Sequence, residues 1–220
     1  MNAERVVVGP SLAGDTAAMT GMATAPATTV LRAQDYRRMR WKNGAGWTSE
    51  VFRCPDADDW NWRVSLAEVE TDAPFSTFPG VERALVLLEG EGMRLRFDDG
   101  EVRDLLPPCG MQRFAGERPL VGQLVDGPSR DFNLMWKRGH ADVQLWRRPL
   151  AGAMVLFADP GETWVAHLLA GQAHFPGQAG PGIMAPGDTA ILRGHGVRTR
   201  FALDGAGELL LARVVEQGEV

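Results

Sequence analysis

The chain has few cysteines and no long apolar run. Its two cysteines in 220 residues, Cys54 and Cys109, each lie beside a proline and cannot make the disulfide framework of a small secreted protein. No apolar run approaches the ~20 residues that a membrane-spanning helix needs. Residues 6–8 are too few for the apolar region of a signal peptide. We therefore expect a cytoplasmic protein with no membrane partner.

Positive charge is also in short supply, because the formal net charge is −5. Nucleic-acid binding needs a basic face, so we expect no nucleic-acid partner. A local cationic pocket remains compatible with this balance. Hydrophobic residues make up 45% and charged residues 23% of the chain, which is ordinary for a globular protein.

What the chain has instead is a series of short strand patterns separated by glycine and proline. Residues 60–67 and 93–97 alternate between apolar and polar positions, and residues 98–100 (Asp-Asp-Gly) are typical of a hairpin turn. Residues 84–88 form a continuous apolar run. Further short strands are predicted at 143–146, 154–157, 164–169, 189–192 and 209–215. Only residues 31–38 favour a turn or two of helix. The pattern predicts an all-β sandwich or barrel.

A weak internal repeat divides the chain. Leu-Leu-Glu-Gly ends an apolar run at Gly90, and Leu-Leu-Ala-Gly ends another at Gly171. A proline-glycine turn follows in each half. This rhythm predicts two similar β-barrels in tandem, over residues 29–138 and 139–220. Residues 1–28 show no period and are predicted to be a flexible extension.

The most informative stretch is residues 41–50, which read Trp-Lys-Asn-Gly-Ala-Gly-Trp-Thr-Ser-Glu. A strand entering a core would carry Val, Ile and Leu at these positions. Glycines beside a lysine and an asparagine let backbone and side-chain donors converge on a small acidic molecule. The stretch therefore predicts a ligand site.

Together with residues 62–69, 74–83 and 127–135, this stretch resembles the HutD/Ves family. The likeness covers roughly residues 30–138. Ala45 stands where the family pattern commonly has glycine, and Glu82 where it commonly has aspartate. The resemblance implies a bicupin, with two double-stranded β-helix (jelly-roll) barrels in one chain. It also implies an accessory or regulatory role in bacterial histidine utilisation, without an established catalytic activity.

Cupin barrels often hold a metal through His-x-His, a glutamate and a distant histidine. The four histidines here lie at 140, 167, 174 and 195, so no two are two positions apart and none lies in the first half. Ligands must converge on one point to hold a transition metal. We expect no metal and no cofactor.

The first barrel is then predicted to bind its ligand by hydrogen bonds and charge. Arg63 and Ser65 share a strand face opposite Trp62, and point into the barrel if the tryptophan packs outward. Lys42, Arg63 and Arg83 would clamp a small carboxylate. Alternatively, acidic side chains of the protein itself pair with Arg63. The predicted ligand-binding residues are Trp41, Lys42, Asn43, Gly44, Thr48, Glu50, Arg63, Ser65, Phe75, Ser76, Phe78, Arg83, Asp131 and Asn133. The aromatic members would wall a planar ligand or, in the alternative, belong to the core.

Three functions stay open at this point. The first is a non-catalytic binding and regulatory module for a small anionic metabolite such as urocanate or formylglutamate. The second is a metal-independent isomerase or hydrolase that acts on a small catabolic acid. The third is an interaction protein with an acidic surface. The second half has weaker motifs and is expected to serve packing or the formation of a homodimer.

Overall fold

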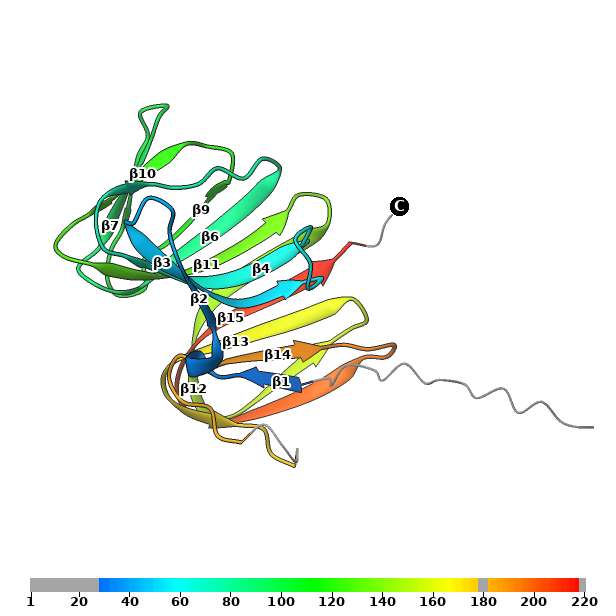
Figure 1. Cartoon of the computed structure of the whole chain (residues 1–220). Helices are drawn as coiled ribbons and strands as arrows, with labels where there is room; N and C mark the ends of the chain where they lie inside the picture. The colour runs from blue at the N-terminus through cyan, green and yellow to red at the C-terminus, as the bar shows by residue number, and fades with distance from the viewer. Residues whose placement is uncertain (1–27, 178–181, 218–220) are drawn as a thin grey trace, which may run out of the picture.

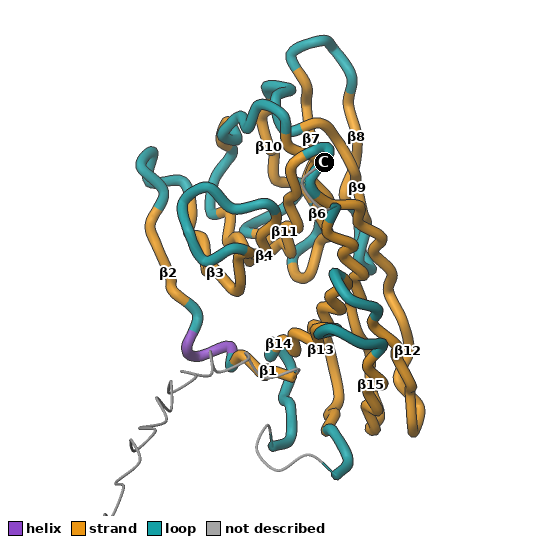
Figure 2. The backbone as a smooth tube through the Cα atoms, turned by 90° about the vertical axis from the view of Figure 1, so that its right-hand side faces the viewer, coloured by secondary structure: helices purple, strands orange, loops and turns teal. Residues whose placement is uncertain are grey.

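The computed structural model describes residues 28–177 and 182–217, and strands dominate both ranges (Figure 1, Figure 2). The described residues contain no α-helix; the one helical segment among them is a 3-10 helix, η1 (Ala33–Asp35). No helix in these ranges has the length and apolar character to cross a bilayer. The all-β prediction is confirmed. The predicted helical pattern over residues 31–38 is wrong beyond η1, because Tyr36 leaves helical geometry and a strand follows.

The N-terminal half contains two sheets. The six-stranded sheet has the order β2-β3-β4-β11-β6-β9, and the four-stranded sheet has the order β5-β10-β7-β8. The first sheet is made of β2 (Arg37–Arg40), β3 (Gly46–Cys54), β4 (Trp62–Val69), β6 (Val81–Glu89), β9 (Met111–Ala115) and β11 (Ser129–Lys137). The second is made of β5 (Ala73–Pro74), β7 (Met93–Phe97), β8 (Val102–Leu105) and β10 (Leu120–Leu124). The paired strands of both sheets run antiparallel.

The C-terminal half has a five-stranded antiparallel sheet in the order β1-β14-β13-β15-β12. Its strands are β1 (Thr28–Leu31), β12 (Ala141–Ala158), β13 (Glu162–His174), β14 (Thr189–Arg193) and β15 (Thr199–Glu216). Glycines lie where β13 and β15 approach most closely. A Cβ on Gly171 would come 1.9 Å from the Ala206 carbonyl oxygen, so only glycine fits there.

The position of β1 corrects the predicted division of the chain. β1 pairs with β14, so residues 28–31 belong to the C-terminal sheet and not to a domain that starts at residue 29. In Figure 1, β1 lies beside β14 in the lower half, and η1 leads the chain up to β2. Asp188 fixes this crossing because its carboxylate accepts hydrogen bonds from the Ala33 amide (2.9 Å) and from Arg32 (2.8 Å). The flexible extension predicted for residues 1–28 otherwise lies outside the described residues.

Three apolar cores hold the sheets together. One fills the space between the two N-terminal sheets, with Leu85, Met93 and Leu95 at its centre. A second lies inside the C-terminal half around Leu168 and Phe201. The third joins the halves: the outer face of the six-stranded sheet packs against the C-terminal sheet. The six-stranded sheet is therefore covered on both faces, and polar groups on its inner face are shielded from water.

Candidate functional site

The side-chain alternation of β4 decides what the inner face of the six-stranded sheet presents. Trp62, Val64 and Leu66 point outward into the core that joins the halves. The intervening residues Arg63 and Ser65 therefore point inward, toward the four-stranded sheet. This confirms the orientation predicted from the sequence.

The strand register gathers further polar residues on this inner face. In one row across the sheet, Glu50 lies opposite Ser65, and Ser65 lies opposite Asn133. In the next row, Met135 lies between Arg63 on β4 and Arg83 on β6. Directly paired residues point to the same face of a sheet, so side chains far apart in sequence converge here.

Asp131 forms the row on the other side of Asn133. It lies opposite Ala67 on β4 and Leu87 on β6, and Thr48 on β3 faces Ala67. Two of the side chains nearest to Asp131 across the sheet are therefore aliphatic. They offer its carboxylate no hydrogen-bond donor.

Arg83 is the most deeply buried cation of this group, with 5% of its surface exposed. Its guanidinium carbon lies 5.4 Å from the ring of Phe75, 5.7 Å from that of Phe78 and 5.2 Å from that of Phe114. It donates one long hydrogen bond, 3.4 Å, to the backbone carbonyl of Ser76. Its Nε has no hydrogen-bond partner among the described residues. Burial, and then the charge of Arg63, lower the pKa of Arg83 to about 10, which leaves it cationic at neutral pH.

Asp131 is fully buried, and neither of its carboxylate oxygens has a hydrogen-bond partner in the described part of the chain. Burial raises its pKa to about 7, although the positive charge of Arg83 acts in the opposite direction. The two groups are thus close enough to interact, yet they form no ion pair within 4.0 Å. Among the described residues, Asn133 Oδ1 and Ser65 Oγ are also buried without hydrogen-bond partners, and Asn133 Nδ2 donates to the sulfur of Met135 at 3.6 Å.

Arg63 is only half-buried, but its Nε is enclosed and has no partner among the described residues. Its guanidinium carbon lies 5.8 Å from the ring of Trp60. Burial lowers its pKa and the charge of Glu50 opposes this effect. The carboxylate of Glu50 lies 3.8 Å from Arg53 instead. In the described ranges, the alternative in which Glu50 or Asp131 forms an ion pair with Arg63 is not realised.

The structure separates the loop residues from this cluster. Lys42, Asn43 and Gly44 lie exposed between β2 and β3, whereas Arg83 is buried, so the clamp of Lys42 with the two arginines stays a prediction. Asn43 Oδ1 accepts a hydrogen bond from the Ala45 amide (3.1 Å), which is a local turn bond and not a ligand contact. Gly44 has φ +74°, a conformation that glycine adopts without strain.

Several of the remaining predicted residues contact Arg83 or a neighbour of Arg83. Trp41 donates from Nε1 to Thr48 Oγ1 at 2.8 Å and packs edge-on against Phe75, with ring centroids 6.1 Å apart. Phe75 and Trp41 both border the inner core. Ser76 is exposed and contributes its backbone carbonyl to Arg83. Phe75, one of the aromatics predicted to wall a ligand, thus contacts a buried cation and also serves the core.

Comparison with known proteins identifies the family. The HutD family model matches residues 33–211. The chain belongs to the HutD family.

Relatives and solved structures agree with this membership. An uncharacterized 21.2 kDa protein in the hutC 3′ region of Pseudomonas putida is 45% identical over 109 residues, which are 49% of this chain and 57% of that protein. Protein Ves of Cronobacter sakazakii is 39% identical over 106 residues, 48% of this chain and 58% of Ves. These matches span little more than half the length of each relative. The HutD family is associated with the histidine-utilisation operon.

Among solved structures, HutD from Pseudomonas fluorescens SBW25, described for a formate condition, superimposes with a TM-score of 0.75. It shares 28% identity over 87% of this chain and 100% of the HutD chain. The bacterial pirin YhhW of Escherichia coli in complex with nickel(II) matches with a TM-score of 0.63 at 10% identity, over 86% of this chain and 99% of the pirin. At that identity the likeness to the pirin shows the cupin-like fold alone.

Nothing in the described ranges of this HutD-family chain reproduces a metal site. No group of three or more His, Cys, Asp or Glu side chains there could hold an ion. His167 instead packs in the interior and shares a 2.9 Å hydrogen bond with Thr189 Oγ1. Burial lowers the pKa of His167 to about 4, so it is neutral at neutral pH.

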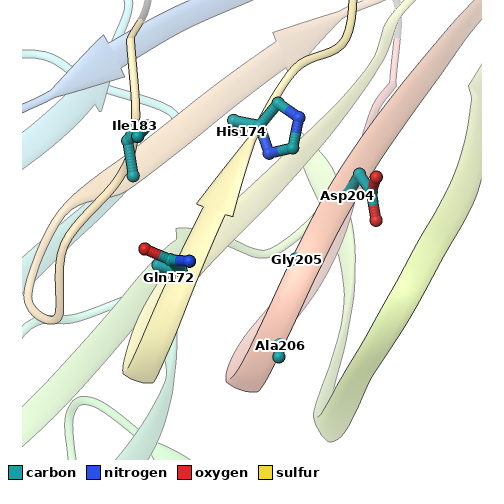
Figure 3. A pocket seen from close by; sticks show the side chains of 6 residues that line it. All are labelled: Gln172, His174, Ile183, Asp204, Gly205 and Ala206. Carbon is teal, nitrogen blue, oxygen red and sulfur yellow. The ribbon is translucent and has the colours of Figure 1, made fainter.

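A hollow that sequence reasoning missed lies in the C-terminal half, with a volume of about 410 Å³ (Figure 3). It is lined by Gln172, His174, Ile183, Asp204, Gly205 and Ala206. His174 and Asp204 are paired across β13 and β15. None of these side chains is a buried polar group without a partner in the described chain. The inner face of the six-stranded sheet, where such groups concentrate, is therefore the stronger candidate site. The only sequence signal for the hollow was a lone histidine at a strand end.

Proposed function

We propose that this HutD-family chain is a bicupin that binds a small carboxylate in its first barrel, without catalysis, and thereby modulates histidine breakdown in the cytoplasm. Urocanate and formylglutamate are the first candidates. The two separate apolar cores, one inside each half, support the bicupin architecture. A second copy of the chain is the partner expected for the C-terminal half.

One observation carries the binding proposal: two arginines face the inner side of one sheet without a carboxylate within ion-pair distance among the residues that the structure describes. Arg83 has a single long bond to a backbone carbonyl, and Arg63 has an enclosed Nε without a partner in the described chain. A buried charge is costly unless it is paired, and the effective penalty is several kcal/mol per ion. An anion that binds between these two cations would pair with both and remove part of this free-energy cost.

The shape of the guanidinium favours a carboxylate as that anion, because two parallel N–H groups match its two oxygens. The rings of Phe75, Phe78 and Phe114 exclude water around Arg83 and strengthen the interaction. The smallest carboxylate is formate, and a HutD protein of this family has been described for a formate condition. Formate therefore belongs in any ligand panel for this chain.

The test is a thermal-unfolding and calorimetric panel of formate, histidine, urocanate and formylglutamate. A ligand at ~100 times its dissociation constant adds about 2.7 kcal/mol of stability. For a chain of this size that is a rise of roughly 5–10 °C in the unfolding temperature. Arg83→Met and Arg63→Met should abolish the rise.

The matched control is Arg96→Met, which removes an arginine from the exposed face of β7. It should bind as the wild type does. If none of the four compounds binds, or if all three arginine variants respond alike, the proposal fails.

A second candidate function rests on the pKa of about 7 that burial gives Asp131. A carboxyl group that titrates near neutrality is suited to general acid–base catalysis, as in a metal-independent isomerase or hydrolase. Incubating each binding compound with the protein and analysing it by chromatography separates the two functions. Unchanged ligand supports the binding module, whereas product that Asp131→Asn no longer forms supports the enzyme.

A further inference from the structure

We propose that the ligand of this site has two unlike ends. One end is a carboxylate that binds the arginines, and the other is an uncharged amide-type group whose N–H groups donate hydrogen bonds to Asp131. This inference rests on the proposed carboxylate site and specifies what else the molecule must carry. It follows from how donors and acceptors are separated along one strand, β11.

The cationic end of the site is the row that contains Met135. Arg63 and Arg83 are paired with Met135 from the two neighbouring strands, so both side chains leave the sheet from the same row of residues. Nε of each arginine has no acceptor among the described residues, and Arg83 donates one long bond to the Ser76 carbonyl, so a carboxylate would supply the missing acceptors. Phe75, which contacts Arg83, also closes this end.

The other end of the site contains acceptors without donors. Asp131 lies four residues from Met135 on β11, so their backbone positions are roughly 13 Å apart at ~3.3 Å per residue. The Arg83 side chain bridges part of this distance, because its charge still acts on the Asp131 carboxyl. Both of its oxygens, and Oδ1 of the intervening Asn133, are buried without partners in the described chain. Ala67 and Leu87, which face Asp131 across the sheet, cannot donate hydrogen bonds. Three unsatisfied acceptors in one buried patch call for N–H groups on the ligand.

The same arrangement excludes two simpler ligands. A monocarboxylate with an apolar tail would satisfy the arginines and leave the three acceptors desolvated, which costs affinity. A dicarboxylate without N–H groups, such as succinate, would leave the three acceptors unpaired, and where Asp131 is ionised it would also be repelled. A monoamide of a dicarboxylic acid carries one negative charge and two N–H donors, and a ureido acid carries one negative charge and three, so both fit the two ends.

The experiment compares pairs of compounds that differ only in those donors. Succinamate, glutaramate and adipamate each carry a terminal amide; the partner of each is the acid of the same length with a methyl ketone in place of the amide. The carbonyl and the carboxylate are kept, so calorimetry on the full chain measures the donors alone. In at least one pair, the amide should bind at least tenfold tighter than the ketone.

The variant that tests the role of Asp131 is Asp131→Ala, in which the preference for the amide should fall below threefold. If Asp131→Ala does not fold, Asp131→Asn serves instead and should reduce the preference at least threefold. Asp142→Asn, which changes an exposed aspartate on β12, is the matched control and should keep the full preference.

The outcomes distinguish failure of the two-ended ligand from failure of the proposed carboxylate site. If formate binds and needs Arg83, but amide and ketone bind alike in all three pairs, the carboxylate site stands and the two-ended ligand is overturned. The inference also fails if the preference survives in both Asp131 variants, or if succinate or glutarate binds as tightly as its monoamide. If no carboxylate binds, both proposals fall.

Discussion

Replacing Asp131 with asparagine should remove a pH dependence that this buried carboxyl imposes on the stability of the fold. Asp131 is fully buried, and its oxygens have no hydrogen-bond partner among the described residues. Ionising it in the folded chain is therefore costly, which is why its pKa rises to about 7 from an ordinary value of 3.8. Asparagine has nearly the same shape and never ionises.

The sign and size follow from proton linkage. Between about pH 4 and pH 7 the folded chain keeps a proton on Asp131 that the unfolded chain has lost. The stability that this proton contributes is complete below the unfolded pKa and disappears as the pH rises through the folded pKa. One pKa unit corresponds to 1.36 kcal/mol, so the full effect is about 4 kcal/mol.

The assay is urea unfolding of wild type and Asp131→Asn at several pH values between 4 and 8. Relative to wild type, the variant should gain about 4 kcal/mol of stability between pH 4 and pH 8, or roughly 10 °C in unfolding temperature. Taking the difference between wild type and variant cancels the pH dependence of stability that other titrating groups contribute. One of these is His167, whose contribution rises with pH. Asp142→Asn should show no such gain.

A difference that stays constant from pH 4 to pH 8 would refute the reasoning. It would mean that Asp131 is already ionised and paired in the folded chain. The unsatisfied acceptors on which the two-ended ligand depends would then not exist.

Three further predictions concern the framework around the site. Gly171→Ala should lower the free energy of unfolding by at least about 3 kcal/mol, because φ is +85° and the new Cβ would lie 1.9 Å from a carbonyl oxygen. Gly152 has φ +82° but open space around it, so Gly152→Ala should lower the free energy of unfolding by only about 1–2 kcal/mol, measured by thermal unfolding. His167 has a folded-state pKa of about 4, so the wild type loses about 3 kcal/mol of unfolding free energy through this ring as the pH falls from about 6.5 to 4. In His167→Gln this loss should be absent. Denaturant titration at each pH checks this, and parallel curves would contradict it. Asp188→Ala should lower the free energy of unfolding by about 3 kcal/mol and speed amide hydrogen exchange in β1, because the carboxylate accepts hydrogen bonds from Ala33, Ala185 and Arg32. An unchanged exchange rate would show that β1 is held by its pairing with β14 alone.

Much of the site could be predicted from the sequence, because it follows from alternation within single strands. Arg63 and Ser65 point inward since Trp62 and Val64 must be buried on the other face. The motif at residues 41–50 was a poorer guide. Lys42 and Asn43 lie exposed in this stretch, and Asn43 makes a local turn bond with the Ala45 amide.

The sequence by itself determined that strands dominate and which face of an alternating strand is polar, because both depend on the period of neighbouring side chains. Only the tertiary structure decided that Arg83 and Asp131 share one buried face with Asn133 between them, and that β1 joins the opposite half. Strand register and sheet order are set by contacts between residues far apart in the chain, and no local pattern encodes them.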